Sequence, residues 1–555
     1  MARSGAVSSA IMASGTLVSR VLGFVKAILL AVALGSTSNM ANVYDVADKI
    51  PNLIYVLVAA GVFNAVLVPQ VIKASKNSTD DGADYISRLV TLAVIVMAVI
   101  TLVVMLLAVP IMNIMTPGWD DGQRSMVITF ALFTLPQIFF YGMYTVMGQV
   151  LNAKGAFGWF MWTPALNNVI AIGALLVFIQ QFGSYAAAQH DLETWTNAQT
   201  FWLAAMATVG VASQALILLW PLKRLGLDLR PKFGWRGIGL STAAKLSGWT
   251  LVTGVIANLA FLALSRTANI PNAYREEYLA ASPPEVIAGN YALNQATMLY
   301  SLPHGVIGLS IATVLFNTMA AAAAEKNTAG VNAALSKALR YSGIANVFFT
   351  ACLIAYAGPL GMLFSGGIQE SGAVIGQVIV VIAIGAPFLT SAFLFGRIFY
   401  AQEDARTPFL VQLIVSVLTV GAAFAIQHWV APNHMVLAIA ACYAGQNILS
   451  TLIYHFWAVK RIGDYGLTEV LETHVRSLAA ALVAAGLGTG VLYLMGGWDA
   501  QGWPWTSLLT SLLTLAVCGV VTGLLYLVML KVFALKELPE LTRPLVARLP
   551  SRLKR

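Results

Sequence analysis

The chain has 555 residues, of which 59% are hydrophobic and 10% charged, against roughly 25% charged in an average soluble domain. This composition excludes an ordinary water-soluble globular protein, and the short alternating segments of a membrane barrel are absent. Apolar runs recur along the whole sequence at the length of about 20 residues that is needed to cross a hydrocarbon core of about 30 Å. The sequence therefore predicts an all-α polytopic membrane protein with about 14 transmembrane helices.

Hydropathy and breaks at charged or Pro/Gly clusters place the spans in chain order near 9–34, 43–72, 87–114, 126–152, 160–181, 200–220, 243–268, 288–320, 341–364, 375–397, 408–427, 436–458, 475–496 and 506–533. If the spans alternate in direction, 26 of the 32 Lys and Arg residues fall on one side, and only Arg124 and Arg275 lie in loops on the other. Because basic loops are retained in the cytoplasm, both termini are predicted to be cytoplasmic. The net charge of +9 then indicates contact with anionic lipid and not with nucleic acid.

The first span carries two basic residues at a depth where a charge is costly. Arg20 lies near its middle and Lys26 follows six residues later, roughly 9 Å along the axis and about 240° around it. One interpretation is that both line a central cleft as contacts for an anion. The alternative is an internal salt bridge to Asp45 or Asp48 of the second span.

The second span begins with charges and a proline. Asp45 and Lys49 are four residues apart, so they can pair on one helix face. Pro51 removes a backbone donor and frees a carbonyl, which predicts a kink beside Asn52. This kink can serve the cleft or a hinge, or reflect ordinary helix packing.

Two further polar residues lie within predicted spans. Arg266, near the outer end of the seventh span, either extends to the headgroups or reaches the cleft. His304 follows Pro303 in the eighth span and is interpreted as a packed polar residue, in preference to a proton relay. The sequence contains no phosphate-binding loop or H-E-x-x-H motif, and its six histidines lack ligand spacing. No catalytic residue, metal ion or cofactor is therefore predicted.

An internal repeat indicates a duplicated architecture. Gly148 to Ala156 reads G-Q-V-L-N-A-K-G-A before Thr163-Pro164, and Gly396 to Ala405 reads G-R-I-F-Y-A-Q-E-D-A before Thr407-Pro408. The two copies are six helices apart, so they keep the same orientation, as in transporters built from parallel repeats. The predicted organisation is an N-terminal lobe over 1–222, a basic cytoplasmic loop over 223–242, a C-terminal lobe over 243–460, and two further helices with a basic tail over 461–555.

Several stretches resemble the MurJ/MviN family of lipid II flippases. They are Ser19-Arg20-Val-Leu-Gly23-Phe24, Lys49-Ile-Pro51-Asn52-Leu, Thr116-Pro117-Gly118, Gln149-Val-Leu-Asn152-Ala and Phe399-Tyr400-Ala-Gln402-Glu-Asp404-Ala-Arg-Thr407-Pro408. The resemblance implies the fold of the multidrug/oligosaccharidyl-lipid/polysaccharide exporters, with two six-helix lobes and two C-terminal helices. It also implies a bacterial inner membrane location. The implied substrate is the undecaprenyl-diphosphate-linked peptidoglycan precursor, lipid II, moved from the inner to the outer leaflet.

The resemblance carries over to the cavity residues only in part. Arg20 matches an arginine of the family, whereas Lys26 stands where a second arginine is usual and keeps only the charge. Tyr55 and Met298 occupy the places of two further arginines. The resemblance therefore implies Arg20 and Lys26 as diphosphate contacts, with Arg266 as a candidate substitute and Pro51, Asn52 and Tyr55 as cavity or hinge residues.

Two other functions stay open on the sequence alone. A cation-coupled drug exporter or an O-antigen-type oligosaccharide flippase would share the fold, because fold does not determine substrate. A membrane scaffold that recruits cell-wall synthesis enzymes is the alternative outside transport, and such proteins are the candidate partners at the cytoplasmic face.

Overall fold

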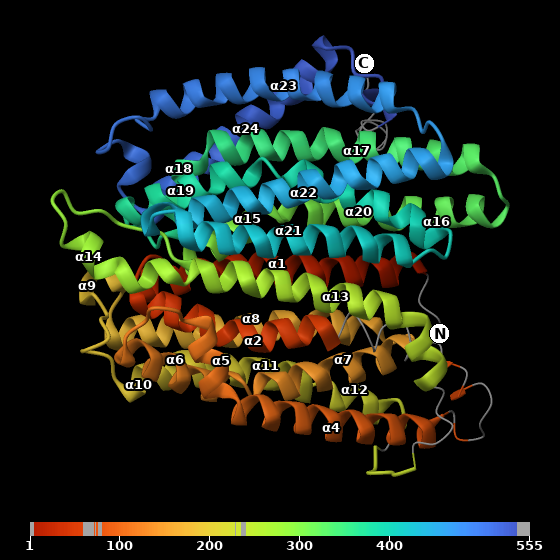
Figure 1. The fold of residues 1–555 in the computed structure, drawn as a ribbon, viewed down its shortest axis with the longest axis horizontal. Helices are drawn as coiled ribbons and strands as arrows, with labels where there is room; N and C mark the ends of the chain where they lie inside the picture. The colour runs from red at the N-terminus through yellow and green to blue at the C-terminus, as the bar shows by residue number, and fades with distance from the viewer. Residues whose placement is uncertain are drawn as a thin grey trace. The chain divides into compact units, whose positions relative to one another are not determined.

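In the computed structural model the described residues are 5–58, 71–72, 74–75, 80, 82–227, 229–234 and 240–540. They are mostly helical and contain no strand (Figure 1). Within these ranges, 13 segments are long and apolar enough to cross a membrane. They correspond to every predicted span except the one near 43–72, part of which lies outside the described residues. The predicted all-α membrane fold is confirmed.

Contacts divide the chain into two compact units, Met1–Tyr291 (unit 1) and Ala292–Arg555 (unit 2). These two units are defined by which residues contact each other, and not by the internal repeat. The predicted lobes rest on the internal repeat, and their boundaries stay a prediction. The helices of unit 1 are α1 (Gly5–Leu34), α2 (Asn39–Val58), α4 (Ala83–Leu106), α5 (Ala108–Met115), α6 (Asp121–Thr134), α7 (Gln137–Ala153), α8 (Phe157–Phe182), α9 (Tyr185–Ala188), α10 (Asn197–Thr200), η2 (Phe201–Ala205), α11 (Met206–Leu216), α12 (Leu219–Arg224), α13 (Leu240–Ala268), η3 (Ile270–Tyr274) and α14 (Arg275–Leu279).

Helix α15 (Asn290–Tyr300) begins at the end of unit 1 and continues into unit 2. The other helices of unit 2 are η4 (His304–Gly308), α16 (Leu309–Ala324), α17 (Thr328–Ala355), α18 (Ala357–Phe364), α19 (Gln369–Ala383), α20 (Ala386–Ala401), α21 (Arg406–Trp429), α22 (Pro432–Ile462), α23 (Leu467–Leu494), η5 (Trp503–Trp505) and α24 (Leu508–Val532).

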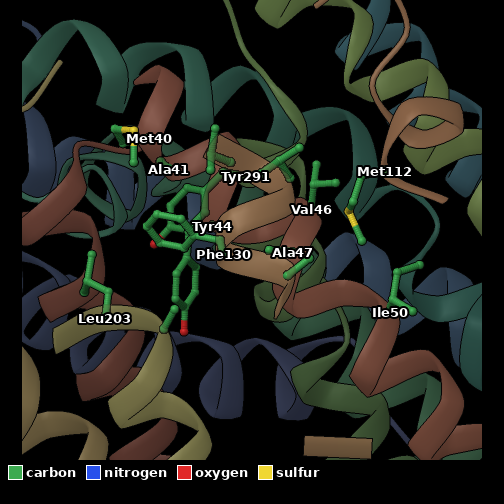
Figure 2. Close-up of a cluster of buried hydrophobic side chains, with 14 of the residues drawn as sticks. Met40, Ala41, Tyr44, Val46, Ala47, Ile50, Met112, Phe130, Leu203 and Tyr291 are labelled. Carbon is green, nitrogen blue, oxygen red and sulfur yellow. The ribbon is translucent and has the colours of Figure 1, made fainter. Parts of the chain in front are cut away.

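The core of unit 1 forms around helix α2. Its residues Met40, Tyr44 and Ala47, spaced as neighbours on one helix face, are all buried. Figure 2 shows the Tyr44 ring against Phe130 of α6, and the two ring centroids are 6.4 Å apart in an edge-to-face arrangement. Because lipid tails are as apolar as these side chains, close packing of this kind is what holds α2 and α6 together.

In unit 2 the ninth helix begins earlier than its predicted span near 341–364. Helix α17 starts at Thr328, where the Asn327 side chain caps it by accepting a hydrogen bond from the Gly330 backbone N–H. Because Lys337 and Arg340 are charged, the hydropathy pattern predicts that they lie in a loop before the ninth span. In the structure they lie on α17 and form ion pairs with Glu540 and Glu537, respectively.

The eighth predicted span, near 288–320, is interrupted. Helix α15 ends at Tyr300, and His304–Gly308 forms a turn of π-helix before α16. Pro303 directly precedes this turn and cannot donate a backbone hydrogen bond. A wide turn of this kind is rare and is often found at functional sites.

Candidate functional site

Helix α1 carries the two basic residues that the sequence singles out, Arg20 and Lys26. It packs against α8, where Asn168 Nδ2 donates a hydrogen bond of 2.8 Å to the Ser19 carbonyl oxygen. This contact fixes the backbone directly beside Arg20. Arg20 is half-buried, and no ion pair joins it to another residue in the described part of the chain. An arginine at mid-membrane costs roughly 2.5–3.5 kcal/mol on insertion scales. The role of Arg20 as a diphosphate contact stays a prediction.

Lys26 lies on a different side of α1. It is half-buried and lines a small cavity together with Tyr44 of α2 and Trp202 of η2, and Arg20 is not among the lining residues. Among the described residues, neither Arg20 nor Lys26 forms a salt bridge with Asp45 or Asp48.

The predicted Asp45–Lys49 pair is confirmed, and it lies inside a buried polar network. Lys49 Nζ is 3.1 Å from Asp45 Oδ2, and the side chains of Lys49 and Asp45 are 6% and 10% exposed. Lys49 Nζ also donates to Ser265 Oγ of α13 at 2.9 Å. Asn290 Nδ2 at the start of α15 donates to both Asp45 Oδ2 and Ser265 Oγ, at 2.9 and 3.0 Å. We call these four residues the helix-2 network.

A second set of contacts runs parallel to the helix-2 network, one turn earlier on α2. Asn42 Nδ2 donates to Asn272 Oδ1 at 3.1 Å, and Asn42 Oδ1 accepts from the backbone N–H of Tyr291 at 3.1 Å. Both asparagines are buried. Polar contacts thus join helix α2 to the segment from α13 to α15, beside the apolar packing of Tyr291 in the core around α2. Such polar contacts are strong in a low-dielectric interior only while every partner is present.

Pro51 frees the Ala47 carbonyl, as the sequence predicts, and the structure supplies its new partner. Thr134 at the end of α6 is fully buried, and its Oγ1 donates to the Ala47 carbonyl oxygen at 2.9 Å. A membrane helix tolerates an internal proline when a neighbouring side chain satisfies the freed carbonyl in this way. Helix α2 accordingly continues through Pro51 to Val58.

Asn52 and Tyr55, the other candidate hinge or cavity residues, make local contacts. Asn52 Nδ2 donates to the Asp48 backbone oxygen at 2.8 Å and to Asp48 Oδ2 at 3.0 Å. The Tyr55 ring stacks on Tyr141 of α7 with centroids 4.7 Å apart. Asn52 therefore holds the turn before Pro51, and Tyr55 belongs to an aromatic cluster against α7. Their roles in a cavity stay predictions.

Arg266 follows Ser265 on α13 but contacts a different helix. Its Nε donates to the Ile114 carbonyl oxygen of α5 at 3.0 Å, whereas Ser265 faces Lys49 of α2. This contact links α13 to α5, and it does not bring Arg266 to the cavity lined by Lys26. Its role as a substitute diphosphate contact stays a prediction.

The sequence reasoning missed the partners of α2, namely Ser265, Asn272 and Asn290. The available signal was three polar residues, one near the end of the seventh predicted span, one in the loop after it and one near the start of the eighth span. Polar residues are common at such positions. No group of three or more His, Cys, Asp or Glu in the described part of the chain is arranged to hold a metal ion.

Comparisons with a family model and with individual proteins point to the same family. The sequence model of the family described as "Lipid II flippase MurJ" matches residues 30–539. A "Lipid II flippase MurJ" from Burkholderia cenocepacia is 25% identical over 94% of this chain and 96% of its own length. A "Probable lipid II flippase MurJ" from Rhizobium meliloti is also 25% identical, over 87% of this chain and 86% of its own length.

Solved structures show the same fold. The structure of "Lipid II flippase MurJ, inward closed conformation" superposes with a TM-score of 0.69 at 17% identity, covering 96% of this chain and 99% of the other. An inward-facing multidrug resistance MATE family transporter superposes with a TM-score of 0.64 at 16% identity, covering 81% of this chain and 96% of the other. At these identities the superpositions establish the exporter fold and not the substrate.

Proposed function

The chain belongs to the lipid II flippase MurJ family, and on that premise we propose that it translocates lipid II from the inner to the outer leaflet of the bacterial inner membrane by alternating access. The match over residues 30–539 is the observation that carries this proposal. Transport of this kind breaks no covalent bond. The proposed orientation has both termini in the cytoplasm, in line with the one-sided distribution of basic residues.

The helix-2 network supports a mechanism in which α2 is held and released. Its bonds join α2 to α13 and to the start of α15, which the internal repeat assigns to the other lobe. Alternating access requires such contacts to break in one state and form in the other. A network that depends on a charge pair is suited to this task, because its members are stable only when paired or when exposed to water.

Arg20 is the proposed primary contact for the diphosphate. A planar guanidinium matches phosphate oxygens with two parallel hydrogen bonds, whereas the Lys26 ammonium acts as a point charge. Arg20 is not among the residues that line the cavity beside Lys26, so we propose that Arg20 is the main contact for the diphosphate and that Lys26 adds a second positive charge from another side of α1. Arg266, bound to α5, is proposed as a secondary contact only.

The test is lipid II movement in reconstituted vesicles. The purified protein is placed in vesicles containing lipid II, and a membrane-impermeant hydrolase reports how much lipid II reaches the outer leaflet. We expect Arg20→Ala to slow this exposure by about tenfold or more, because a hydrogen bond to a charged group contributes roughly 1.5–3 kcal/mol. Arg224→Ala is the matched control, since Arg224 belongs to the same unit and is exposed, and its guanidinium stacks on the Trp220 ring at 3.7 Å from the centroid. Vesicles in which wild-type protein leaves the exposure rate unchanged would contradict the proposal.

The alternative of drug export is supported by the shared fold with multidrug transporters alone. It predicts that expression of the chain protects cells from cationic compounds while leaving the leaflet distribution of lipid II unchanged. Binding of cell-wall synthesis proteins at the cytoplasmic face stays a prediction, and affinity purification of the full chain from membranes tests it.

A further inference from the structure

A cavity lies at one end of unit 2, where parts of four helices meet. Its volume is about 720 Å³, within the range of roughly 300–1,000 Å³ that is typical of ligand sites. The lining comes from the end of α16, the start of α17, the end of α20 with the loop after it, and the last turn of α22. We call this cavity the unit 2 pocket. The proposed orientation places this end of the unit in the cytoplasm.

The lining of the unit 2 pocket combines an apolar helix face with polar groups. Phe316, Ala320 and Ala323 are spaced by four and three residues, so they share one face of α16. The amide and hydroxyl groups of the lining come from helix ends and belong to Asn327, Thr328 and Gln402. An apolar wall with a few polar groups is the usual composition of a site for a small ligand.

Three charged side chains line the unit 2 pocket, namely Lys326, Glu403 and Arg461. None of them forms an ion pair with another residue in the described part of the chain. Arg461 Nε donates a hydrogen bond of 3.0 Å to Gln402 Oε1, and its two terminal nitrogens have no hydrogen-bond partner among the described residues. Asp404 is outside the lining, and donors of its own loop already bond to its carboxylate.

Two of these charged residues stand where glycine would fit with less strain. Lys326 has a φ of 56° just after α16 ends, and Glu403 has a φ of 59° just after α20 ends. They are two of the four non-glycine residues with a positive φ in the described part of the chain. Helices commonly end on glycine in this left-handed conformation. Because the turns do not need a side chain, the presence of charged ones there indicates a function for the charges.

The charges of the unit 2 pocket fit a ligand that carries both signs, with negative charge in excess. Lys326 and Arg461 attract anionic groups, and the first turn of α17 at Thr328 adds the partial positive charge of a helix N-terminus. Glu403 attracts a cation and disfavours a ligand that is only negative, such as the headgroup of an anionic phospholipid. The amide groups of the lining can bond to a peptide backbone.

We propose that the unit 2 pocket binds the peptide part of the lipid II head. This peptide ends in a free carboxylate and contains a side-chain amine. The carboxylate binds Lys326 and Arg461, and the amine binds Glu403. This inference rests on the proposed function, because it assigns a second contact to the same substrate whose diphosphate is assigned to Arg20.

The first experiment compares two lipids in vesicles. One is lipid II, and the other is the same lipid-linked disaccharide without its peptide. A membrane-impermeant hydrolase that cuts at the shared diphosphate reports the movement of either lipid, at a lipid content well below saturation. Lys326→Gly and Arg461→Gln should each slow lipid II by about tenfold, the usual effect of losing a hydrogen bond to a charged group. Neither variant should change the movement of the lipid without peptide.

The matched controls share the chemistry of these changes but lie outside the unit 2 pocket. Gln189→Gly replaces another non-glycine residue of positive φ, in unit 1, and Lys460→Gln removes the charge beside Arg461 on α22. Both should leave the movement of the two lipids unchanged. Lys326→Gly should also keep the wild-type thermal unfolding midpoint, because glycine suits its φ, so slower transport cannot be ascribed to loss of fold. Equal slowing of both lipids by Lys326→Gly and Arg461→Gln, or slowing of neither, overturns the inference.

The second experiment measures binding without transport. The probe is the soluble peptide of lipid II, with its side-chain amine either free or acetylated, added to the detergent-solubilised full chain. Wild type should bind the free-amine peptide more tightly, whereas Glu403→Gln should bind the two peptides about equally. Wild type that binds the peptide through Lys326 and Arg461 but moves no lipid II overturns the proposed function and keeps the peptide site. Binding of phosphatidylglycerol and not of the peptide through these two residues overturns the inference and assigns the pocket to an anionic lipid.

Discussion

Two charge pairs with the same spacing in unit 1 have opposite surroundings. Asp45 and Lys49 of α2 are 10% and 6% exposed, whereas Asp84 and Arg88 at the start of α4 are 42% and 39% exposed. Both pairs are carboxylate and base four residues apart, at 3.1 and 2.8 Å. The difference shows that spacing predicts which residues pair, while burial determines what the pair does.

The buried pair is part of a network that joins three helices, whereas the exposed pair joins the start of α4 to the segment around Lys232 where both are open to solvent. Lys49 and Asp45 reach Ser265 and Asn290, each from another helix. Asp84 adds Lys232 at 2.7 Å, and all three side chains remain in contact with solvent. A solvated pair gains little because water and salt screen it, whereas loss of one buried partner leaves a charge without compensation.

The largest expected effect comes from breaking the buried pair. Lys49→Met should lower the free energy of unfolding by about 3–5 kcal/mol, because Asp45 would keep a buried charge without its cation. Arg88→Met is the matched control at the exposed pair and should leave the thermal unfolding of the detergent-solubilised protein nearly unchanged. Comparable losses for the two variants would contradict the role assigned to burial.

Replacing both buried charges sharpens this test. Because a buried ion pair pays heavily for desolvation, the double variant Asp45→Asn with Lys49→Met should recover much of the stability lost in the single variant. If the helix-2 network holds and releases α2 during transport, the rate of lipid II movement by the double variant will nevertheless differ from the wild-type rate. Equal stability and equal lipid II movement in the double variant and wild type would show that the network is dispensable.

The next effect tests a buried neutral donor beside the same pair. Thr134→Val removes the hydroxyl that satisfies the Ala47 carbonyl freed by Pro51, and should cost about 1–3 kcal/mol of unfolding free energy. Thr129→Val is the matched control on the same helix, since Thr129 Oγ1 bonds to the Ser125 carbonyl of its own helix near solvent. The thermal unfolding midpoints of the two variants should therefore differ, and identical midpoints would remove the role given to Thr134.

These cases show what the sequence could and could not predict. The Asp45–Lys49 pair and the carbonyl freed by Pro51 follow from helix geometry within one segment, so both were predictable. Their partners, Ser265 and Thr134, come from distant segments and depend on how the helices pack. Hydropathy located the spans because each is a local property, but it placed the start of α17 too late since Lys337 resembles a loop residue until Glu540 is known.

The candidate site was predictable to a smaller extent than the fold. The sequence identified Arg20 and Lys26 by their cost in a bilayer, yet it could not tell that Lys26 points to Tyr44 and Trp202. It interpreted His304 as a packed polar residue, but it could not identify Thr390 and Phe393 of α20 as the residues that His304 contacts.

The smallest expected effect is at Glu540 of unit 2, which is exposed and forms an ion pair with Lys337. Its carboxylate accepts hydrogen bonds from Lys337 Nζ at 2.8 Å and from the Tyr341 hydroxyl. The Lys337 bond, followed by the Tyr341 bond, lowers the pKa of Glu540 below its ordinary value.

A carboxyl group with a lowered folded-state pKa adds stability above its unfolded-state pKa and loses that stability as the pH falls through the folded-state pKa. Glu540→Gln should therefore unfold at a slightly lower temperature than wild type at pH 7, and the difference should vanish once the pH falls below the folded-state pKa of Glu540, and in high salt. Wild type and variant must be compared in the same detergent, since the contact is solvated. A difference that persists unchanged at low pH would mean that the Glu540 side chain stabilises this end of the chain by packing and not by its charge.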